Sequence, residues 1–171
     1  MIFPTNFLWG ASTSAFQVEG GYNEGGKGVA TTDLGARRPG IADNKVAADH
    51  YHHWKEDVDL MAELGLKVYR MGFAWSRIMP DATCTPNPEG LAFYDRLIDY
   101  LLEKGIEPLV TLYHFECPQA LVDAYDKLGI QVMTGYGLSE CAPLVSLNTR
   151  MKKDAIGMPG SYCKVRIADD G

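Results

Sequence analysis

The sequence has no C-x-x-C pair, no excess of basic residues and no long apolar run. Its cysteines stand far apart, which argues against a zinc or disulfide framework and favours free thiols in a cytosolic protein. A formal net charge of −6 argues against binding to nucleic acid or to an anionic membrane, because such proteins carry basic patches. No stretch approaches the roughly 18 apolar residues that span a bilayer. The four cysteines are Cys84, Cys117, Cys141 and Cys163.

The first 15 residues also lack the basic segment that opens a secretory signal peptide, so the sequence predicts a cytoplasmic protein. With 171 residues, of which 46% are apolar and 22% charged, the chain is long enough for one ordinary globular domain with a core. Neither nucleic acid nor membrane is an expected partner.

Apolar residues recur at helical spacing over residues 46–64 and 91–102, which predicts two amphipathic helices. Short apolar runs at 7–12, 67–75 and 107–114 predict strands, and we expect the first of them to be buried. Strands that alternate with amphipathic helices indicate parallel βαβ units. Asp43 or Asn44 can cap the first helix, and Asn87-Pro88 is a favourable opening for the second.

The same alternation continues toward the C-terminus. Residues 119–128 predict a third helix and residues 130–133 a fourth strand. Beyond residue 138 the pattern is irregular, with one strand expected at 164–167. The glycine-rich segment at 20–40 predicts a loop. Each of the three helices is followed by a glycine that can end it, namely Gly65, Gly105 and Gly129.

Four segments carry a more specific signal. They are residues 7–20 (FLWGASTSAFQVEG), 49–57 (DHYHHWKED), 69–78 (YRMGFAWSRI) and 111–119 (TLYHFECPQ). Together they resemble glycoside hydrolase family 1, the family of β-glucosidases and 6-phospho-β-glucosidases, over residues 2–124. The pair Met71-Gly72 departs from the aromatic-serine pair that is commoner in the family.

This resemblance implies a (β/α)8 barrel, whose site lies at the C-terminal ends of the strands. In the family, the residues that match Gln17 and His114 hydrogen-bond the hydroxyls of the terminal sugar. The residue that matches Arg70 sits beside the nucleophilic carboxylate and keeps it ionised through its opposite charge. A small-molecule sugar is therefore the implied partner, with no cofactor and no metal.

The catalytic carboxylates that the family requires are absent from this sequence. A retaining glycosidase needs a nucleophile and an acid/base about 5–5.5 Å apart. The family carries them in a Thr-Phe/Leu-Asn-Glu-Pro segment and a Thr-Glu-Asn-Gly segment, and neither occurs here. Glu19 and Glu116 match positions that the family does not use for catalysis. We therefore expect this chain to be inactive as a β-glucosidase.

Two other patterns have simpler explanations. His50 and His53 share a helix face, but no third ligand is evident, so packing or surface roles are favoured over a metal site. The glycine-rich residues 24–28 lack the spacing and the Lys-Ser/Thr ending of a P-loop, so a turn is favoured over a phosphate site.

Residues after about 125 resemble another family. The segment 129–140 (GIQVMTGYGLSE), followed by 154–160 (DAIGMPG) and 164–167 (KVRI), is similar to the adenylate-forming superfamily of acyl-CoA synthetases. Its implied nucleotide-binding residues are Tyr136, Gly137, Ser139 and Glu140, with Ser139 in place of the usual threonine. The resemblance implies Mg-ATP as the cofactor of that ancestor only, because the phosphate loop, ribose-binding aspartate and catalytic lysine of the superfamily are absent.

The sequence thus predicts an α/β protein of two parts. Residues 1–124 would form the first three βα units of a barrel, and residues 125–171 a βα-like fragment of an adenylate-forming enzyme. Three hypotheses stay open: a β-glucoside-hydrolysing ancestry with lost activity, an ATP-dependent ligase fragment, and a non-catalytic α/β fusion product. Because a partial barrel leaves parallel-sheet edges open, we also expect self-association and marginal stability.

Overall fold

The structure is a computed structural model that describes residues 3–34, 40, 43–130, 134–136, 146–148 and 158–159. The chain divides into two compact units, Met1–Asp123 and Ala124–Gly171. This division concerns packing alone, so the different ancestry that the sequence suggests for residues 125–171 stays a prediction.

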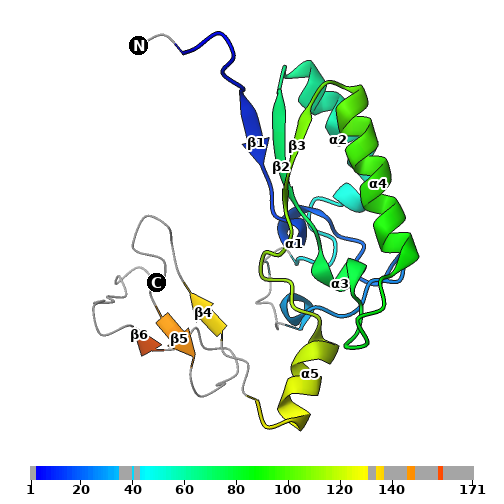
Figure 1. Ribbon diagram of the computed structural model, residues 1–171, viewed down its shortest axis with the longest axis vertical. Helices are drawn as coiled ribbons and strands as arrows, with labels where there is room; N and C mark the ends of the chain where they lie inside the picture. The colour runs from blue at the N-terminus through cyan, green and yellow to red at the C-terminus, as the bar shows by residue number, and fades with distance from the viewer. Residues whose placement is uncertain are drawn as a thin grey trace. The chain divides into compact units, whose positions relative to one another are not determined.

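The first unit contains a parallel three-stranded sheet in the order β1-β2-β3 (Figure 1). The strands are β1 (Gly10–Ser12), β2 (Val68–Gly72) and β3 (Glu107–Thr111). Each of the two strand pairs is parallel, with Ser12 and Leu109 as the partners of Arg70 on either side. The parallel βαβ arrangement expected for this part of the chain is therefore confirmed.

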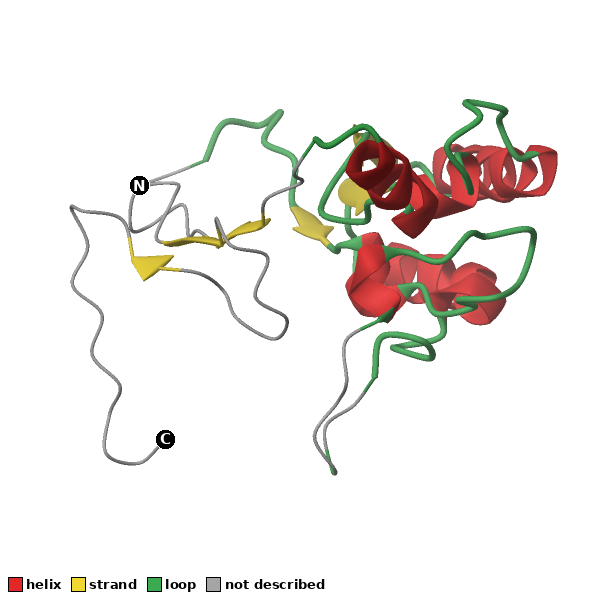
Figure 2. Ribbon diagram, turned by 90° about the horizontal axis from the view of Figure 1, so that it is seen from below, coloured by secondary structure: helices red, strands yellow, loops and turns green. Residues whose placement is uncertain are grey.

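Helices lie along one side of this sheet, as Figures 1 and 2 show. The long helices are α2 (His50–Glu63) and α4 (Pro88–Glu103). Alternate residues of β2, Tyr69 and Met71, pack into the core beneath them, whereas Arg70 on the opposite side of the strand is exposed. The core consists of nine buried residues: Val58, Tyr69, Met71, Ile78, Phe93, Tyr94, Leu97, Leu101 and Ile106.

Two single-turn helices follow the strands. They are α1 (Ala15–Val18), just after β1, and α3 (Trp75–Ile78), just after β2. The apolar periodicity did not indicate either of them, because four residues are too few to show a helical repeat. A 3-10 turn at Thr31–Asp33 and the helix α5 (Gln119–Lys127) complete the helical elements among the described residues.

Helix α4 begins where the sequence indicates. Asn87 is its N-cap, with its side chain accepting a hydrogen bond from the Glu89 backbone N–H, and Pro88 occupies the first turn. The buried face differs in part from the expected one. Leu91 and Leu102 are exposed, and Phe93 takes their place in the core. The helix thus turns a different set of apolar residues toward the sheet than periodicity alone selects.

The predicted cap of α2 was wrong. Neither Asp43 nor Asn44 caps the helix, which begins only at His50, with Asp49 as its N-cap at φ 57°. Asp43 instead accepts a local hydrogen bond from the Lys45 N–H, which closes a turn before the helix. The end of α2 agrees with the prediction, because Gly65 follows the last turn at φ +78°.

The prediction that residues 7–12 form a buried strand was also wrong. Only Gly10–Ser12 are in β1, and all three residues are exposed. Phe7 and Trp9 are exposed as well, with their rings 4.9 Å apart between centroids. These residues are exposed because β1 lies at the edge of the sheet, and because one face of the sheet carries no layer among the described residues.

The second unit does not continue the parallel pattern. Its sheet has the order β4-β5-β6 and is antiparallel, with β4 (Thr134–Tyr136), β5 (Ser146–Asn148) and β6 (Met158–Pro159). This corrects the βα-like continuation expected after residue 125. Of the expected strand at 130–133, Ile130 is not in a strand and the remaining residues lie outside the described ranges, as does 164–167.

Candidate functional site

The candidate site lies at the C-terminal ends of the three parallel strands. Because the strands are parallel, the segments that follow them emerge at the same edge of the sheet. Gln17 lies on α1 after β1, Arg70 lies within β2, and His114 follows β3. These are the three residues for which the sequence implies a role at a sugar site.

Gln17 is held by its backbone, and its side chain is exposed. Its N–H donates to the carbonyl oxygen of Ser14 at 2.9 Å, which closes the turn of α1. Within the described part of the chain, the Gln17 amide has no hydrogen-bond partner. An exposed amide can donate to one sugar hydroxyl and accept from another.

His114 is half-buried, and one of its ring nitrogens is engaged. Its Nδ1 atom lies 3.1 Å from Ser14 Oγ. The ring also packs against Phe115, with 4.8 Å between the ring centroids. No hydrogen bond of Nε2 is present among the described residues, so this nitrogen is the one that a ligand could use.

Arg70 is exposed, on the side of the sheet that carries no layer among the described residues. Its Nε–H donates to Thr111 Oγ1 of the neighbouring strand at 3.0 Å. The guanidinium forms no ion pair with a carboxylate in the part of the chain that the structure describes. An exposed arginine fixed by a neighbouring hydroxyl is suited to bind a carboxylate supplied from elsewhere.

Beneath this edge lies a buried ion pair that the sequence analysis missed. Arg77 Nε donates to Glu19 Oε1 at 2.5 Å, and both side chains are buried. The Tyr94 hydroxyl donates to the second oxygen of the Glu19 carboxylate at 2.7 Å. Burial, followed by the charge of Glu19, raises the pKa of Tyr94 well above its usual range. Glu19 therefore serves the structure, since its carboxylate is fully occupied.

Arg77 also holds the glycine-rich loop. Its guanidinium donates to the carbonyl oxygens of Gly20, Gly21 and Glu24 at 3.2, 3.1 and 3.0 Å. Residues 22–26 form turns, and Gly25 has φ +57° with the Tyr51 hydroxyl in the space that a Cβ would need. The path of the loop is thus set by its contacts with the Arg77 and Tyr51 side chains, and its turn structure agrees with the turn favoured for residues 24–28.

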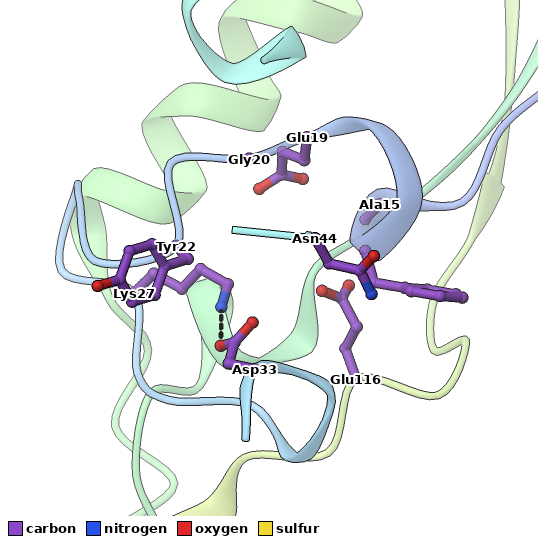
Figure 3. A pocket seen from close by; sticks show the side chains of 9 residues that line it. Ala15, Glu19, Gly20, Tyr22, Lys27, Asp33, Asn44 and Glu116 are labelled. Atoms are coloured by element: carbon purple, nitrogen blue, oxygen red, sulfur yellow. Dashed lines mark hydrogen bonds and ion pairs between the residues drawn. The ribbon is translucent and has the colours of Figure 1, made fainter. Parts of the chain in front are cut away.

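A small polar cavity lies beside this ion pair (Figure 3). Its volume of about 10 Å³ suits a single water molecule. Lys27 and Asp33 form an ion pair of 2.8 Å on one side, while Glu19 and Glu116 also line the cavity. Glu116 is only 3% exposed. Its burial, reinforced by the charge of Glu19, raises the pKa of Glu116 to about 8.

The histidines of α2 are paired with carboxylates. His50 Nδ1 lies 2.6 Å from Asp57 Oδ2, and His53 Nδ1 lies 2.9 Å from Glu56 Oε2. A hydrogen bond to Asp49 raises the pKa of His52. Over the residues that the structure describes, no group of three or more histidine, cysteine, aspartate or glutamate side chains is arranged to hold a metal ion.

The implied nucleotide residues lie in the second unit. Tyr136 is the last residue of β4, and Gly137, Ser139 and Glu140 lie outside the described ranges. Their proposed contacts with a nucleotide stay a prediction. None of the helices in the described part of the chain is long and apolar enough to cross a membrane.

Comparison with known families addresses the first unit. The sequence model of Glycosyl hydrolase family 1 matches residues 1–134, which is more than half of the chain. The chain belongs to glycosyl hydrolase family 1. The match runs ten residues past the boundary expected at residue 124.

Relatives of this family 1 chain are glucosidases of bacteria and plants. The aryl-phospho-β-D-glucosidase BglC of Bacillus subtilis is 50% identical over 127 residues, which cover 72% of this chain and 27% of the relative. β-Glucosidase 42 of Arabidopsis thaliana is 52% identical over 156 residues, which cover 88% of this chain and 32% of the relative. The chain thus spans about a quarter to a third of the length of the curated relatives it matches.

The fold comparison agrees. The family 1 β-glucosidase of Thermotoga maritima superposes with a TM-score of 0.66 at 44% identity, over 71% of this chain and 28% of that one. The same enzyme has been solved in complex with castanospermine. The structural neighbours are (β/α)8 barrels, and the parallel sheet of this chain corresponds to part of such a barrel.

Proposed function

We propose that this family 1 chain carries the sugar-holding part of a β-glucoside site. Gln17 and His114 hydrogen-bond the hydroxyls of the terminal sugar, and Arg70 faces the position of a nucleophilic carboxylate. The observation that carries the proposal is that Gln17 and His114 follow the C-terminal ends of β1 and β3, the two neighbours of the strand β2 that contains Arg70. Within the described chain, the Gln17 amide and His114 Nε2 have no hydrogen-bond partner, and the Arg70 guanidinium has no acidic partner, so all three groups are free to bind a ligand.

The chemistry of the proposed site is retaining hydrolysis of β-glucosides, which needs two free carboxylates. The two carboxylates that lie closest to the site in the sequence are unsuited to it. Glu19 is neutralised by Arg77, and Glu116 is buried with a pKa of about 8, so it holds a proton at neutral pH. With neither family segment present in these 171 residues, we propose that the chain binds a sugar without hydrolysing it.

The test is a binding titration combined with a turnover assay. Glucose and glucose 6-phosphate are titrated separately into the protein by calorimetry, and hydrolysis of a chromogenic β-glucoside is followed in parallel. We expect saturable binding of one sugar, weakened by His114→Ala and by Gln17→Ala, and no hydrolysis. His53→Ala is the matched control, because His53 is exposed on α2 and its ring bonds Glu56 of the same helix. Absence of saturable binding of either sugar would refute the proposal.

A second candidate concerns residues 125–171. The motif Tyr136-Gly137-x-Ser139-Glu140 favours an adenylate-forming ancestor, in which the tyrosine packs against adenine and the glutamate helps to hold Mg²⁺. Against it stands the Arabidopsis match: 88% of 171 residues is about 150, so that match must include part of this segment. ATP–pyrophosphate exchange by the protein would support a ligase function, and its absence would leave a non-catalytic fusion.

We also propose a cytoplasmic location and self-association. Cys84 and Cys117 are free thiols, as is usual in a reducing compartment. The sheet edges at β1 and β3 have no further strand paired to them in the described part of the chain. Unpaired edges favour association with another chain.

A further inference from the structure

Ser14 occupies a position at which serine normally uses its side chain locally. It is the N-cap of α1, with extended backbone angles of φ −116° and ψ 134°. A serine at this position typically accepts a hydrogen bond from a backbone N–H in the first turn. The Ser14 side chain makes no such bond, although its carbonyl oxygen accepts one from the Gln17 N–H at 2.9 Å.

The Ser14 hydroxyl is directed instead to a residue 100 positions away. Its Oγ atom lies 3.1 Å from Nδ1 of His114. Ser14 is only 9% exposed, so water competes little for this contact. Among the described residues Oγ has no other partner. The Ser14 hydroxyl thus bonds the distant His114 imidazole instead of capping the helix, and this contact restrains the orientation of the ring.

We propose that Ser14 is a positioning residue for His114. Its O–H donates to Nδ1, which keeps the ring proton on Nε2 and presents Nε2–H as a donor to a sugar hydroxyl. In a neutral imidazole, a hydrogen-bond partner at one ring nitrogen decides which nitrogen carries the proton and in which direction the other nitrogen faces. This inference rests on the proposed sugar site.

Ser14 also links the two predicted sugar ligands. Through its backbone it closes the turn that carries Gln17, and through its side chain it holds His114. The two ligands come from segments that follow different strands, β1 and β3. Loss of the Ser14 hydroxyl frees the imidazole to rotate and to change tautomer, but leaves the backbone bond of Gln17 in place.

The test reads the tautomer directly. Long-range ¹H–¹⁵N spectra of the imidazole are recorded on the whole chain at about pH 7.5, where an ordinary imidazole is mostly neutral. We expect His114 to show an unprotonated Nδ1 and a protonated Nε2, and Ser14→Ala to move its signals toward a tautomer mixture. Ser14→Thr keeps the hydroxyl and should restore the original signals. Ser12→Ala, which removes an exposed hydroxyl of β1, should change nothing. A protonated Nδ1 in the unaltered chain, or identical spectra for Ser14→Ala, would overturn the inference.

Sugar affinity is measured on the same proteins. We expect Ser14→Ala to weaken glucose binding about fivefold, which corresponds to the loss of one ordinary hydrogen bond, and Ser14→Thr to recover most of it. Circular dichroism verifies that each variant is folded. If no variant and no unaltered chain binds sugar while the tautomer responds as expected, the proposed function fails and the positioning role stands. If sugar binds equally to all variants, the positioning role fails and the proposed function stands.

Discussion

The Arg77 guanidinium and the Glu19 carboxylate form an ion pair at 2.5 Å inside the first unit, with Arg77 completely buried. The pair joins the segment after β1 to the segment after β2, 58 residues apart. The remaining guanidinium N–H groups donate to three loop carbonyl oxygens, and the second carboxylate oxygen accepts from the Tyr94 hydroxyl. Both charges are thus neutralised and hydrogen-bonded, which is the condition under which a buried ion pair is tolerated.

Replacing Arg77 by methionine should therefore be severely destabilising. The substitution leaves the Glu19 carboxylate buried without an opposite charge, and such losses cost about 3–5 kcal/mol of unfolding free energy. Urea denaturation followed by circular dichroism measures the change. Arg77→Lys keeps the positive charge but loses the several N–H donors of the guanidinium. Its unfolding free energy should lie between those of the unaltered chain and Arg77→Met, and it provides the measurement if Arg77→Met does not fold. Arg70→Met, at an exposed arginine of β2, is the control, and an equal effect of Arg70→Met and Arg77→Met would contradict the prediction.

The elements that could be predicted from the sequence are those with a local cause. Helix α4 begins at Asn87-Pro88 because its cap and first turn lie within three residues of one another. The start of α2 could not be predicted in this way. Asp43 offers the same side-chain chemistry as a cap, but the turn that it forms with Lys45 competes, and the helix begins seven residues later.

Glu116 should make the stability of the protein depend on pH. Burial and the charge of Glu19 raise its pKa to about 8, whereas in the unfolded chain it has an ordinary value near 4.3. Between these values the native state holds a proton that the unfolded state has released. The contribution of Glu116 to stability is thus fully present below about pH 4, falls as the pH rises toward 8, and is constant above.

Glu116→Gln removes this dependence, since an amide does not titrate. We expect the variant to gain stability over the unaltered chain as the pH rises from 5 to 8, by a few kcal/mol at most, with no further gain above. Urea denaturation at a series of pH values gives the difference. Glu103→Gln, at an exposed glutamate at the end of α4, should show no such trend. A pH-independent difference for Glu116→Gln would mean that Glu116 is ionised in the folded chain.

Asn87 should contribute more than an ordinary helix cap. Besides accepting from the Glu89 N–H, its side-chain amide donates to the carbonyl oxygens of Gly25 and Arg77 at 2.7 and 2.9 Å. A cap alone is worth about 1 kcal/mol, and each further hydrogen bond adds about as much. Asn87→Ala is therefore expected to lower the unfolding free energy by about 2–3 kcal/mol in urea denaturation. Asn23→Ala, in an exposed turn, is the control and should cost less than about 0.5 kcal/mol. An equally small loss for Asn87→Ala would show that the hydrogen bonds of the Asn87 side-chain amide are not formed.

The site could be predicted only in part, for a related reason. Gln17, Arg70 and His114 could be proposed because each stands in a motif that resembles a known family. Ser14 stands in the same motif, but its use depends on a contact with His114 across 100 residues, which no local pattern encodes. Arg77 likewise stands in the segment 69–78, but its partner Glu19 lies in another segment 58 residues away, so no local pattern indicates the ion pair.

One side of the parallel sheet carries no layer among the described residues, and we expect this side to drive association of the chain with itself. Leu109, in the middle of β3, is 56% exposed and is the strand partner of Arg70. Parallel sheets are normally covered on both faces, so an apolar side chain here is a site for contact with another molecule. Leu109→Glu replaces it with a carboxylate beside Arg70, where an opposite-charge pair across two strands is mildly stabilising.

We therefore expect sedimentation of the unaltered chain to show concentration-dependent oligomers, and Leu109→Glu to shift the distribution toward monomer without a loss of helix signal. Leu60→Glu is the matched control, because Leu60 is 57% exposed but lies on α2, away from the sheet. It should leave the oligomers unchanged. Equal effects of the two variants would assign association to general surface apolarity rather than to the sheet. A monomeric chain with a sharp, cooperative unfolding transition would show that the uncovered side is not available for contact at all.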